Sequence, residues 1–478
     1  MGFPLLLFAV TLLPPGLFLC QPVGATNQDH GNGVVERIEK KVESIISSFQ
    51  QLIRDETVSS GFLFAATLLA LLLANSAAAS QYLAAVTLPI KLMLGDWLFE
   101  FDVLHFVNDG LMTLFFMVLG LEIKRELLVG ELRNMRQAVP VLAAALGGMV
   151  LPALIYYLIN AGEPSARGWG IAMATDSAFA LGVLMLLGRR VPAGLKAFLV
   201  AYAIIDDLGA ILVIAFFYTE ALDTAFLVAA AGCFSALAVF NFLGLRHLFL
   251  YLCVGFLLWF CVVSAGLHGT VAGVLIAAAV PARPRRDQRW FVRRTQKLAG
   301  MLQQRIERGD SILEAPEQHA MAEAVSEAAK SVTTPLQRWE RMLERPVLLF
   351  VLPLFALVNA GIPLSGERLT TAASDVVSWG VVFGLVAGKT LGISLMTWIT
   401  LMAGIGRLPE GVRMGHVIGV ALLGGMGFTM SIFIAGLTFS GQEPLYIAKI
   451  AILAASIVAG GSGYLWLRFA VKPENSYK

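Results

Sequence analysis

The sequence predicts an all-α polytopic membrane protein with twelve transmembrane helices. Hydrophobic residues make up 57% of its 478 residues and charged residues 14%, against about 25% charged residues in soluble proteins. The mean hydropathy of +0.75 leaves no room for a large soluble domain. Apolar runs of about 20 residues, long enough to cross a bilayer, recur after residue 55. They lie near 58–78, 104–124, 138–160, 168–188, 193–219, 222–241, 246–263, 265–281, 345–361, 376–402, 414–438 and 446–469.

Lysine and arginine residues indicate the orientation of these runs. Basic residues precede the first run and follow the even-numbered runs, for example at 124–136, 189–196 and 283–294. Cytoplasmic loops of membrane proteins carry such an excess of positive charge. Both ends of the membrane domain are therefore predicted to lie in the cytoplasm.

The runs divide the chain into an N-terminal extension 1–55, membrane parts 56–282 and 342–470, a hydrophilic insert 283–341 and a cytoplasmic tail 471–478. The extension begins like a secretory signal but lacks a basic n-region. A cleaved signal, an extra segment and a wrong start therefore remain open, and residues 34–54 have the spacing of an amphipathic surface helix. The insert is predicted to be helical and cytoplasmic, either a solvated connector or a regulatory or partner-binding element.

Composition also argues against several function classes. A net charge of +2 gives no reason to expect nucleic-acid binding. The four cysteines lack metal-ligand spacing, and no cofactor is indicated. An enzyme is the weakest interpretation, because no nucleophile and base accompany the membrane charges at a recognisable spacing.

A short hairpin is predicted on the extracytoplasmic side, between the first and second runs. Strand-like residues flank Gly95 and Asp96 within 86–101, the pattern of two strands joined by a tight turn. An exposed strand edge invites pairing with a second copy. The hairpin is therefore a candidate contact for a homodimer.

Charged residues inside the runs carry the functional argument. Asp206 and Asp207 stand together in the middle of the fifth run, where each charge costs about 2.5–3.5 kcal/mol on insertion scales. A chain that keeps such a pair is predicted to bind a cation or carry protons with it. Lys389, in the tenth run, is an intramembrane charge of opposite sign, and we expect Asp206 to be its partner because an unpaired buried charge is costly.

Two further runs contain polar or glycine-rich interruptions. Thr175 and Asp176 interrupt the fourth run, and three glycines and two hydroxyl residues interrupt the eleventh at 424–431. Matching interruptions in two halves of a transporter point to a binding site built on broken helices. Taken alone, the glycines would be better explained by close helix packing.

Titratable residues near the ends of the runs are candidates for a response to pH. A dense mixed-charge turn at the cytoplasmic end of the second run contains Glu122, Arg125 and Glu126. It is either a solvated face of ion pairs or a charge cluster at a funnel mouth. His268 lies near the start of the eighth run. An unperturbed histidine titrates near neutrality, although a lone histidine is more often structural.

Six stretches of the chain are informative when they are taken together. They include Ala-Thr-Asp-Ser-Ala-Phe-Ala-Leu-Gly-Val-Leu at 174–184, Ala-Ile-Ile-Asp-Asp-Leu-Gly-Ala-Ile at 203–211 and Gly-Lys-Thr-Leu-Gly-Ile-Ser-Leu at 388–395. The other three lie at 115–127, 352–361 and 427–435. Together they resemble the NhaA family of Na+/H+ antiporters. The resemblance covers about 56–470 apart from the insert, and it implies inverted-topology repeats with discontinuous fourth and eleventh helices.

The resemblance also implies roles for individual residues. Asp207 matches the principal cation-binding carboxylate, and Asp206 matches the neighbouring carboxylate that pairs with Lys389. Thr175 matches a residue that lends an oxygen to the site, while Asp176 matches one that offsets the partial charges of helix ends. The positions tied to pH activation are Glu122, Arg125, Glu126 and Glu340.

The implied activity is electrogenic, pH-regulated exchange of Na+ or Li+ for protons across the bacterial inner membrane, by a homodimer without a cofactor. Cation and proton would compete for the aspartate pair, since a small cation needs hard oxygen ligands. A sodium-coupled symporter would need a pocket for an organic substrate, for which the sequence has no polar or aromatic cluster. A membrane sensor that keeps the carboxylates as buried pairs is the rival from another class.

The chain departs from the family pattern at several places. The insert and the first 55 residues have no counterpart in compact members of the family. Thr390 stands where proline is common, and Gly269 stands where alanine is familiar. Glu344 occupies a position near the cytoplasmic mouth where histidine occurs. The pH at which transport begins therefore cannot be carried over from the family.

Overall fold

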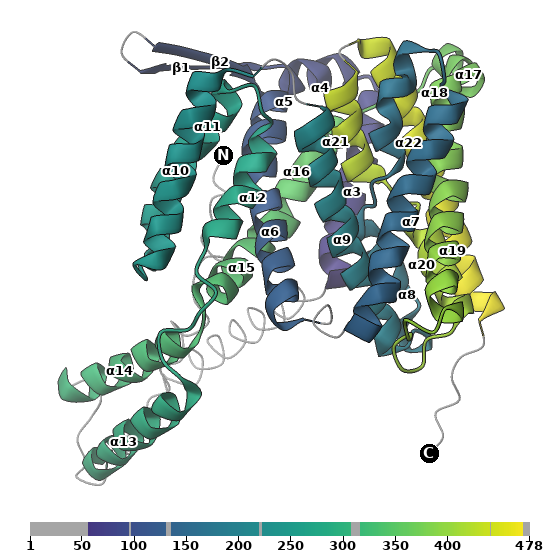
Figure 1. Ribbon diagram of the computed structural model, residues 1–478. Helices are drawn as coiled ribbons and strands as arrows, with labels where there is room; N and C mark the ends of the chain where they lie inside the picture. Colours follow the sequence, from purple (N-terminus) through teal and green to yellow (C-terminus); the bar gives the residue numbers. More distant parts are fainter. Residues whose placement is uncertain are drawn as a thin grey trace, which may run out of the picture.

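The computed structural model describes residues 56–94, 97–130, 135–218, 222–306, 316–439 and 441–471. The N-terminal extension, with its predicted signal and amphipathic segment, lies outside the described residues, as does nearly all of the predicted tail. The described chain is almost entirely helical, and Figure 1 shows its membrane part as a bundle of roughly parallel and antiparallel helices. Side chains such as Phe216 and Phe242, which are 78% and 92% exposed on the outside of this bundle, suit a surface that faces lipid.

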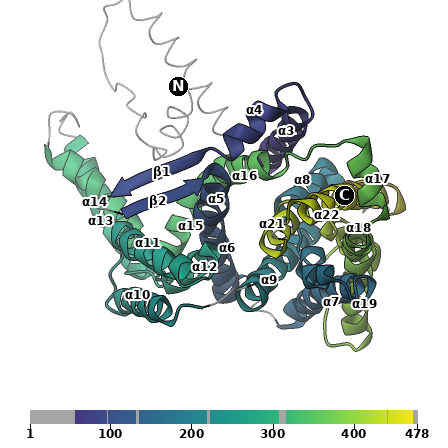
Figure 2. The ribbon, with the colours of Figure 1, turned by 90° about the horizontal axis from the view of Figure 1, so that it is seen from above.

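Seen from above, the bundle consists of two groups of helices (Figure 2). One group contains α6 (Met112–Val129), α10 (Thr224–Phe242), α11 (Leu248–Ser264), α12 (Gly269–Ala279) and α15 (Pro335–Pro346). The other contains α7 (Met135–Ile159), α8 (Ser177–Leu186), α9 (Ala193–Phe217), α18 (Val376–Val382), α19 (Lys389–Met402), α20 (Met414–Gly424), α21 (Phe428–Thr438) and α22 (Gln442–Leu465). Helices α3 (Glu56–Ala74) and α16 (Leu352–Asn359) pack against each other, and α3 also contacts α8 in the second group.

Within the described residues, seven helices are long and apolar enough to cross a membrane, and three bent helix pairs raise this number to ten if each pair crosses once. The first pair turns through 119° between α3 and α4 (Ala79–Val86). The other two bend by 42° and 43°, and they are described with the site below. Helices α11 and α12 are apolar but shorter. The structure is therefore that of a polytopic all-helical membrane protein, while the count of twelve spans stays a prediction.

A two-stranded antiparallel sheet lies at one end of the bundle, beside α5 (Val103–His105) (Figure 1). Strand β1 (Pro89–Leu94) pairs with β2 (Trp97–Asp102), in a register that places Pro89 opposite Asp102 and Leu94 opposite Trp97. The opposite end of the bundle carries α13 (Gln288–Ile306) and α14 (Pro316–Val332), which project away from it as a helical hairpin. The sheet and this hairpin therefore lie at opposite ends of the molecule.

The helix after this hairpin begins earlier than the predicted end of the insert. Thr334 caps α15 by accepting a hydrogen bond from the backbone N–H of Gln337, which is the usual role of a threonine at a helix start. Helix α15 continues through a π-helical turn at Val347–Val351 into α16. Leu336 and Trp339 are buried, at 3% and 4% exposure. Residues 335–341 thus form part of a long helix of the bundle.

Glycines allow two helices to approach closely beside Lys389, the charged residue of the tenth run. Gly147 on α7 and Gly392 on α19 lie so close that a Cβ on either would collide with the carbonyl oxygen of the other. Gly388 lies against the backbone of Pro152, whose Cα would be 2.7 Å from an added Cβ. Small residues drive helix association in membranes by permitting such contacts. This interface fixes α19, which begins with Lys389, against α7.

The close approach makes Gly392→Ala a sharp test of this packing. The added methyl group must separate the two helices, and overpacking of this kind costs about 1–3 kcal/mol. We expect a lower apparent melting temperature for the detergent-solubilised protein. Gly461→Ala on α22 is the matched control, because a Cβ there has no atom within 4 Å among the described residues. Equal melting temperatures for the two variants would contradict the interface.

Candidate functional site

Two interrupted helices meet in the second group of helices. A 3-10 helix (Pro164–Ala172) is followed by an extended stretch and then by α8, and α20 is separated from α21 by a short break. The backbone N–H of Asp176 in the first break donates to the carbonyl of Met426 in the second, with 2.6 Å between the atoms. Ser431 on α21 donates to the carbonyl of Ile171 at 2.7 Å. The two breaks are therefore held against each other by hydrogen bonds.

Asp176 belongs to the first break and serves the N-termini of two helices. One carboxylate oxygen accepts from the backbone N–H of Phe179, at 3.1 Å, and so caps α8. The other oxygen accepts from the backbone N–H and the hydroxyl of Thr429 at the start of α21. Helix N-termini carry partial positive charge and unsatisfied N–H groups. A buried carboxylate at this point offsets both.

Lys389 lies at the centre of the site. Its Nζ is 2.9 and 2.8 Å from the two carboxylate oxygens of Asp206, 2.7 Å from Thr175 Oγ1 and 3.0 Å from the hydroxyl of Tyr202. Lys389 and Asp206 are completely buried, at 0% exposure. Thr175 in turn donates to the carbonyl of Gly424, at 2.8 Å. The ammonium group thereby joins α9, α19 and both breaks.

Asp207 differs from its neighbour Asp206 in its contacts. Consecutive residues of an α-helix point about 100° apart, so the two carboxylates on α9 face different directions. Asp207 is buried, with 3% exposure. Its carboxylate makes no hydrogen bond or ion pair with any residue that the structure describes, whereas both oxygens of Asp206 accept from Lys389. One carboxylate of the pair is committed to a protein cation and the other is not.

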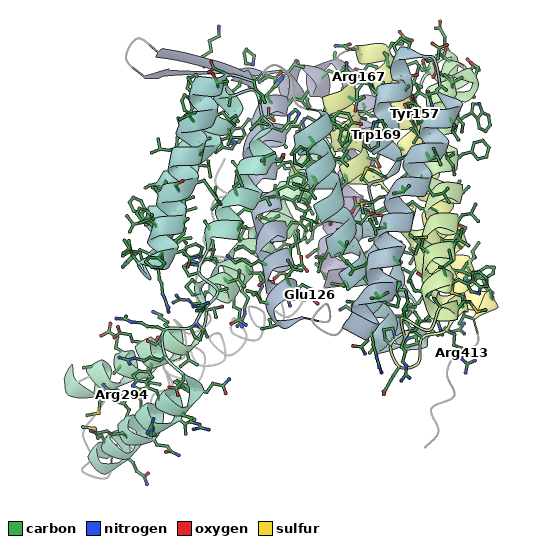
Figure 3. The ribbon with its side chains drawn as sticks, viewed as in Figure 1. Glu126, Tyr157, Arg167, Trp169, Arg294 and Arg413 are labelled. Atoms are coloured by element: carbon green, nitrogen blue, oxygen red, sulfur yellow. The ribbon has the colours of Figure 1, made fainter. Side chains whose placement is uncertain are left out.

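The mixed-charge turn at the end of α6 forms a separate cluster. Arg125 Nε is 2.8 Å from Glu340 on α15, and the other guanidinium nitrogens are 3.8 and 3.5 Å from Glu122 and Glu126. Figure 3 shows Glu126 at the lower end of the bundle. Lys124, in the same turn, donates to the carbonyls of Ala278 and Val280 at the end of α12. One ion-pair network between α6 and α15 therefore contains four of the residues that were predicted to respond to pH: Glu122, Arg125, Glu126 and Glu340.

His268 does not belong to that network. It precedes α12 as its N-cap residue, and its Nε2 is 2.9 Å from the carbonyl oxygen of Tyr218 at the end of α9. The Tyr218 hydroxyl donates to the carbonyl of Arg167, a residue near the upper end of the bundle in Figure 3. His268 thus lies at the end opposite Glu126, where it links α12 to the helix that carries the aspartate pair.

Sequence reasoning missed two members of the site, Tyr202 and Thr429. Tyr202 is fully buried beside Lys389, and Thr429 holds Asp176. The available signal for Tyr202 was its position four residues before Asp206, because residues four apart share a helix face. Thr429 was noted only as one hydroxyl in the interruption of the eleventh run.

Comparisons with known proteins show the family to which the chain belongs. The sequence model of the family described as Na+/H+ antiporter 1 matches residues 50–467. The chain is 45% identical to Na(+)/H(+) antiporter NhaA 1 of Saccharophagus degradans over 432 residues, which cover 90% of this chain and 93% of that protein. It is 44% identical to the NhaA antiporter of Sulfurimonas denitrificans over 439 residues, or 91% of this chain and 98% of that protein.

A third relative is the NhaA antiporter of Helicobacter pylori, 42% identical over 431 residues that cover 90% of this chain and 97% of that protein. Family match and identities extend over nearly the whole membrane part of the chain. The chain is therefore a multi-pass membrane protein of the NhaA family of Na+/H+ antiporters, which are transporters and not enzymes.

Proposed function

We propose that this chain exchanges Na+ or Li+ for protons electrogenically and in a pH-regulated manner, with cation and proton competing for the aspartate pair. The observation that carries the proposal is the difference between the two carboxylates. Both oxygens of Asp206 accept from Lys389, while the Asp207 carboxylate is buried and has no hydrogen bond or ion pair within the described part of the chain. A buried carboxylate without a partner gains most from binding a cation or a proton.

Asp207 is the direct ligand of the cation in this mechanism. Asp206 and the Thr175 hydroxyl supply further hard oxygen atoms, which a small cation requires. Thr175 and Asp206 both contact Lys389, so an ion that draws their oxygens away weakens the bonds of the ammonium group. Cation entry and proton release are thereby coupled through the same atoms.

Alternating access turns this competition into exchange. The two interrupted helices hold the site between their breaks, and their bends of 42° and 43° are nearly equal. That similarity supports inverted-topology repeats, in which one part of the protein moves against the other around a fixed site. Protons enter down their gradient and Na+ is expelled. Two protons per Na+ are carried if the Asp206–Lys389 pair also exchanges a proton, and transport then moves net charge.

The ion-pair network around Arg125 is the proposed element of pH regulation. Three carboxylates contact the guanidinium group of Arg125, and only that of Glu340 comes from α15. Protonation of Glu340 therefore weakens the ion pair between α6 and α15. His268 contacts the end of α9 and is a second candidate. Arg125 lies on α6 and His268 caps α12, and both helices contact α9, which carries the aspartate pair.

We also propose that the end of the bundle bearing α13 and α14 faces the cytoplasm of a bacterial cell, with the ends of the membrane domain on that side. Positive charge gathers there: burial and the neighbouring guanidinium groups of Arg285 and Arg338 lower the pKa of Arg246, in the loop between α10 and α11. Such clustering agrees with the positive-inside rule. The β1–β2 sheet is then extracytoplasmic, and its strand edges are the proposed contact of a homodimer.

Replacing the uncommitted carboxylate tests the site directly. Asp207→Asn keeps the size of the side chain but removes its charge, and we expect Na+-induced collapse of an imposed pH gradient in everted vesicles to fall to background. The matched control is Asp223→Asn, which alters an exposed cap of α10 and should leave the rate unchanged. Exchange at the wild-type rate in Asp207→Asn would exclude this site and would favour a sensor with buried structural pairs.

Electrogenic exchange has its own test in proteoliposomes. Entry of two protons for each Na+ expelled builds a membrane potential that opposes further turnover. Valinomycin with K+ dissipates this potential, so we expect Na+-driven proton movement to accelerate after its addition. Equal rates with and without valinomycin would mean that transport is electroneutral, and the Asp206–Lys389 pair would then carry no second proton.

The helical hairpin of the insert is proposed to be a solvated connector. The backbone N–H groups of Arg285 and Arg286 both donate to the carbonyl of Ser331, at 3.0 and 3.1 Å, so the two ends of the hairpin already lie together. Replacing 288–330 with a short glycine-serine linker should leave the exchange rate and its pH profile unchanged. A displaced pH profile, measured in the same vesicles, would instead assign the insert a regulatory role.

A further inference from the structure

A pocket of about 120 Å³ lies between the short helix α17 (Gly366–Ser374) and the start of α22. Figure 1 shows α17 at the same end of the bundle as the β1–β2 sheet. The residues that line the pocket come from these two helices and include none of those proposed for cation exchange. Pockets for drug-sized ligands measure about 300–1,000 Å³, so this pocket suits a smaller group.

Two opposite charges line the pocket. Arg368 from α17 and Glu443 from α22 are both exposed, and neither forms an ion pair with a residue in the described part of the chain. The Arg368 guanidinium group lies over the ring of Tyr446, 5.1 Å from its centroid, and this contact restrains it. One of its five N–H donors is 3.5 Å from the carbonyl oxygen of Pro363. Most of its donors are therefore available to an anion.

These charges define the chemistry of a ligand. A guanidinium group suits the oxygens of a phosphate, and the Glu443 carboxylate can accept hydrogen bonds from an ammonium group. A ligand that carries a phosphate and a primary ammonium group a few bonds apart satisfies both. A quaternary ammonium group has no N–H to donate, and the aromatic ring that could bind it, Tyr446, is engaged by Arg368.

The position of the pocket along α22 favours a lipid over a soluble compound. The apolar helix Gln442–Ala470 has 29 residues, which gives a length of about 43 Å at 1.5 Å per residue. A bilayer with its headgroup regions is about 40–45 Å thick, so the first turn of this helix lies among the headgroups. Ile447 and Ile450 also line the pocket. They lie farther along the helix, toward the acyl chains.

We propose that this pocket binds the headgroup of an ethanolamine phospholipid, with the phosphate on Arg368 and the ammonium group on Glu443. The lipid then bridges α17 and α22 at the membrane surface. The orientation proposed above places it in the extracytoplasmic leaflet. The binding itself goes beyond cation exchange and does not depend on the aspartate pair.

Lipid binding to the delipidated, detergent-purified protein tests this site. Native mass spectrometry gives an apparent Kd for dioleoyl phosphatidylethanolamine and for dioleoyl phosphatidylglycerol, which lacks the ammonium group. We expect the wild type to prefer the ethanolamine lipid. Arg368→Gln should weaken the binding of both lipids about fivefold, the upper range for an exposed charge pair. Glu443→Gln should weaken only the ethanolamine lipid, so that the preference falls about fivefold.

Arg167→Gln and Glu163→Gln are the matched controls, because both remove exposed charges outside the pocket. Arg167 lies at the same end of the bundle (Figure 3). Both controls should bind the two lipids like the wild type. Soluble O-phosphoethanolamine is the second probe, and we expect it to bind at least about 100-fold more weakly than the lipid, which adds apolar contacts through its acyl chains. Melting temperatures are recorded for every variant.

Equal affinity of the wild type for the two lipids, or an unchanged preference in Glu443→Gln, overturns the ethanolamine headgroup. Unchanged binding in Arg368→Gln, or an equal loss in Arg167→Gln, overturns the pocket as the site. Equal affinity for O-phosphoethanolamine and the lipid overturns the lipid and assigns the pocket to a soluble ligand. Asp207→Asn should bind the lipid like the wild type, so failure of the lipid site and failure of the exchange site are distinguishable.

Discussion

The rest of the site depends on one buried cation, the ammonium group of Lys389. An ammonium ion inside a membrane protein is tolerated only when its charge is paired and its three hydrogens are bonded. Asp206 supplies the charge, and Thr175 and Tyr202 supply the remaining acceptors. Removing one partner of a buried ion pair costs about 3–5 kcal/mol. The two helix breaks are therefore held together by the hydrogen bonds that satisfy this buried charge, through Thr175, as well as by packing.

The need to pair Lys389 gives the two adjacent aspartates different environments. Asp206 is committed to Lys389, whereas Asp207 points about 100° away around the helix and makes no hydrogen bond or ion pair with the described residues. Two free carboxylates side by side would repel each other, and one would take up a proton. The lysine removes this conflict for one member of the pair. The other member is left without a protein partner among the described residues, and this difference is the basis of the proposed cation site.

Much of this site could be predicted from the sequence because each charged residue leaves a local mark, a polar residue inside an apolar run. Lys389 and Asp206 are 183 residues apart, yet charge balance alone suggested that they meet. Tyr202 and Thr429 escaped prediction because neither is costly in a membrane helix, so neither stands out from its run. The start of α15 at Pro335 was not predicted, because the polar residues of its first turns resemble the hydrophilic insert that precedes it. The polytopic helical fold followed from apolar length, and the polar and glycine-rich interruptions indicated two of the three bends, but the 119° bend between α3 and α4 was not predicted.

The same network is the basis of the coupling that we propose between cation and proton. In the proposed exchange, a cation bound to Asp207 draws on the Thr175 and Asp206 oxygens that also hold Lys389, so the ion and the ammonium group compete for acceptors. Because each buried polar group must keep a partner, gain of the ion and loss of a proton become parts of one exchange of hydrogen bonds.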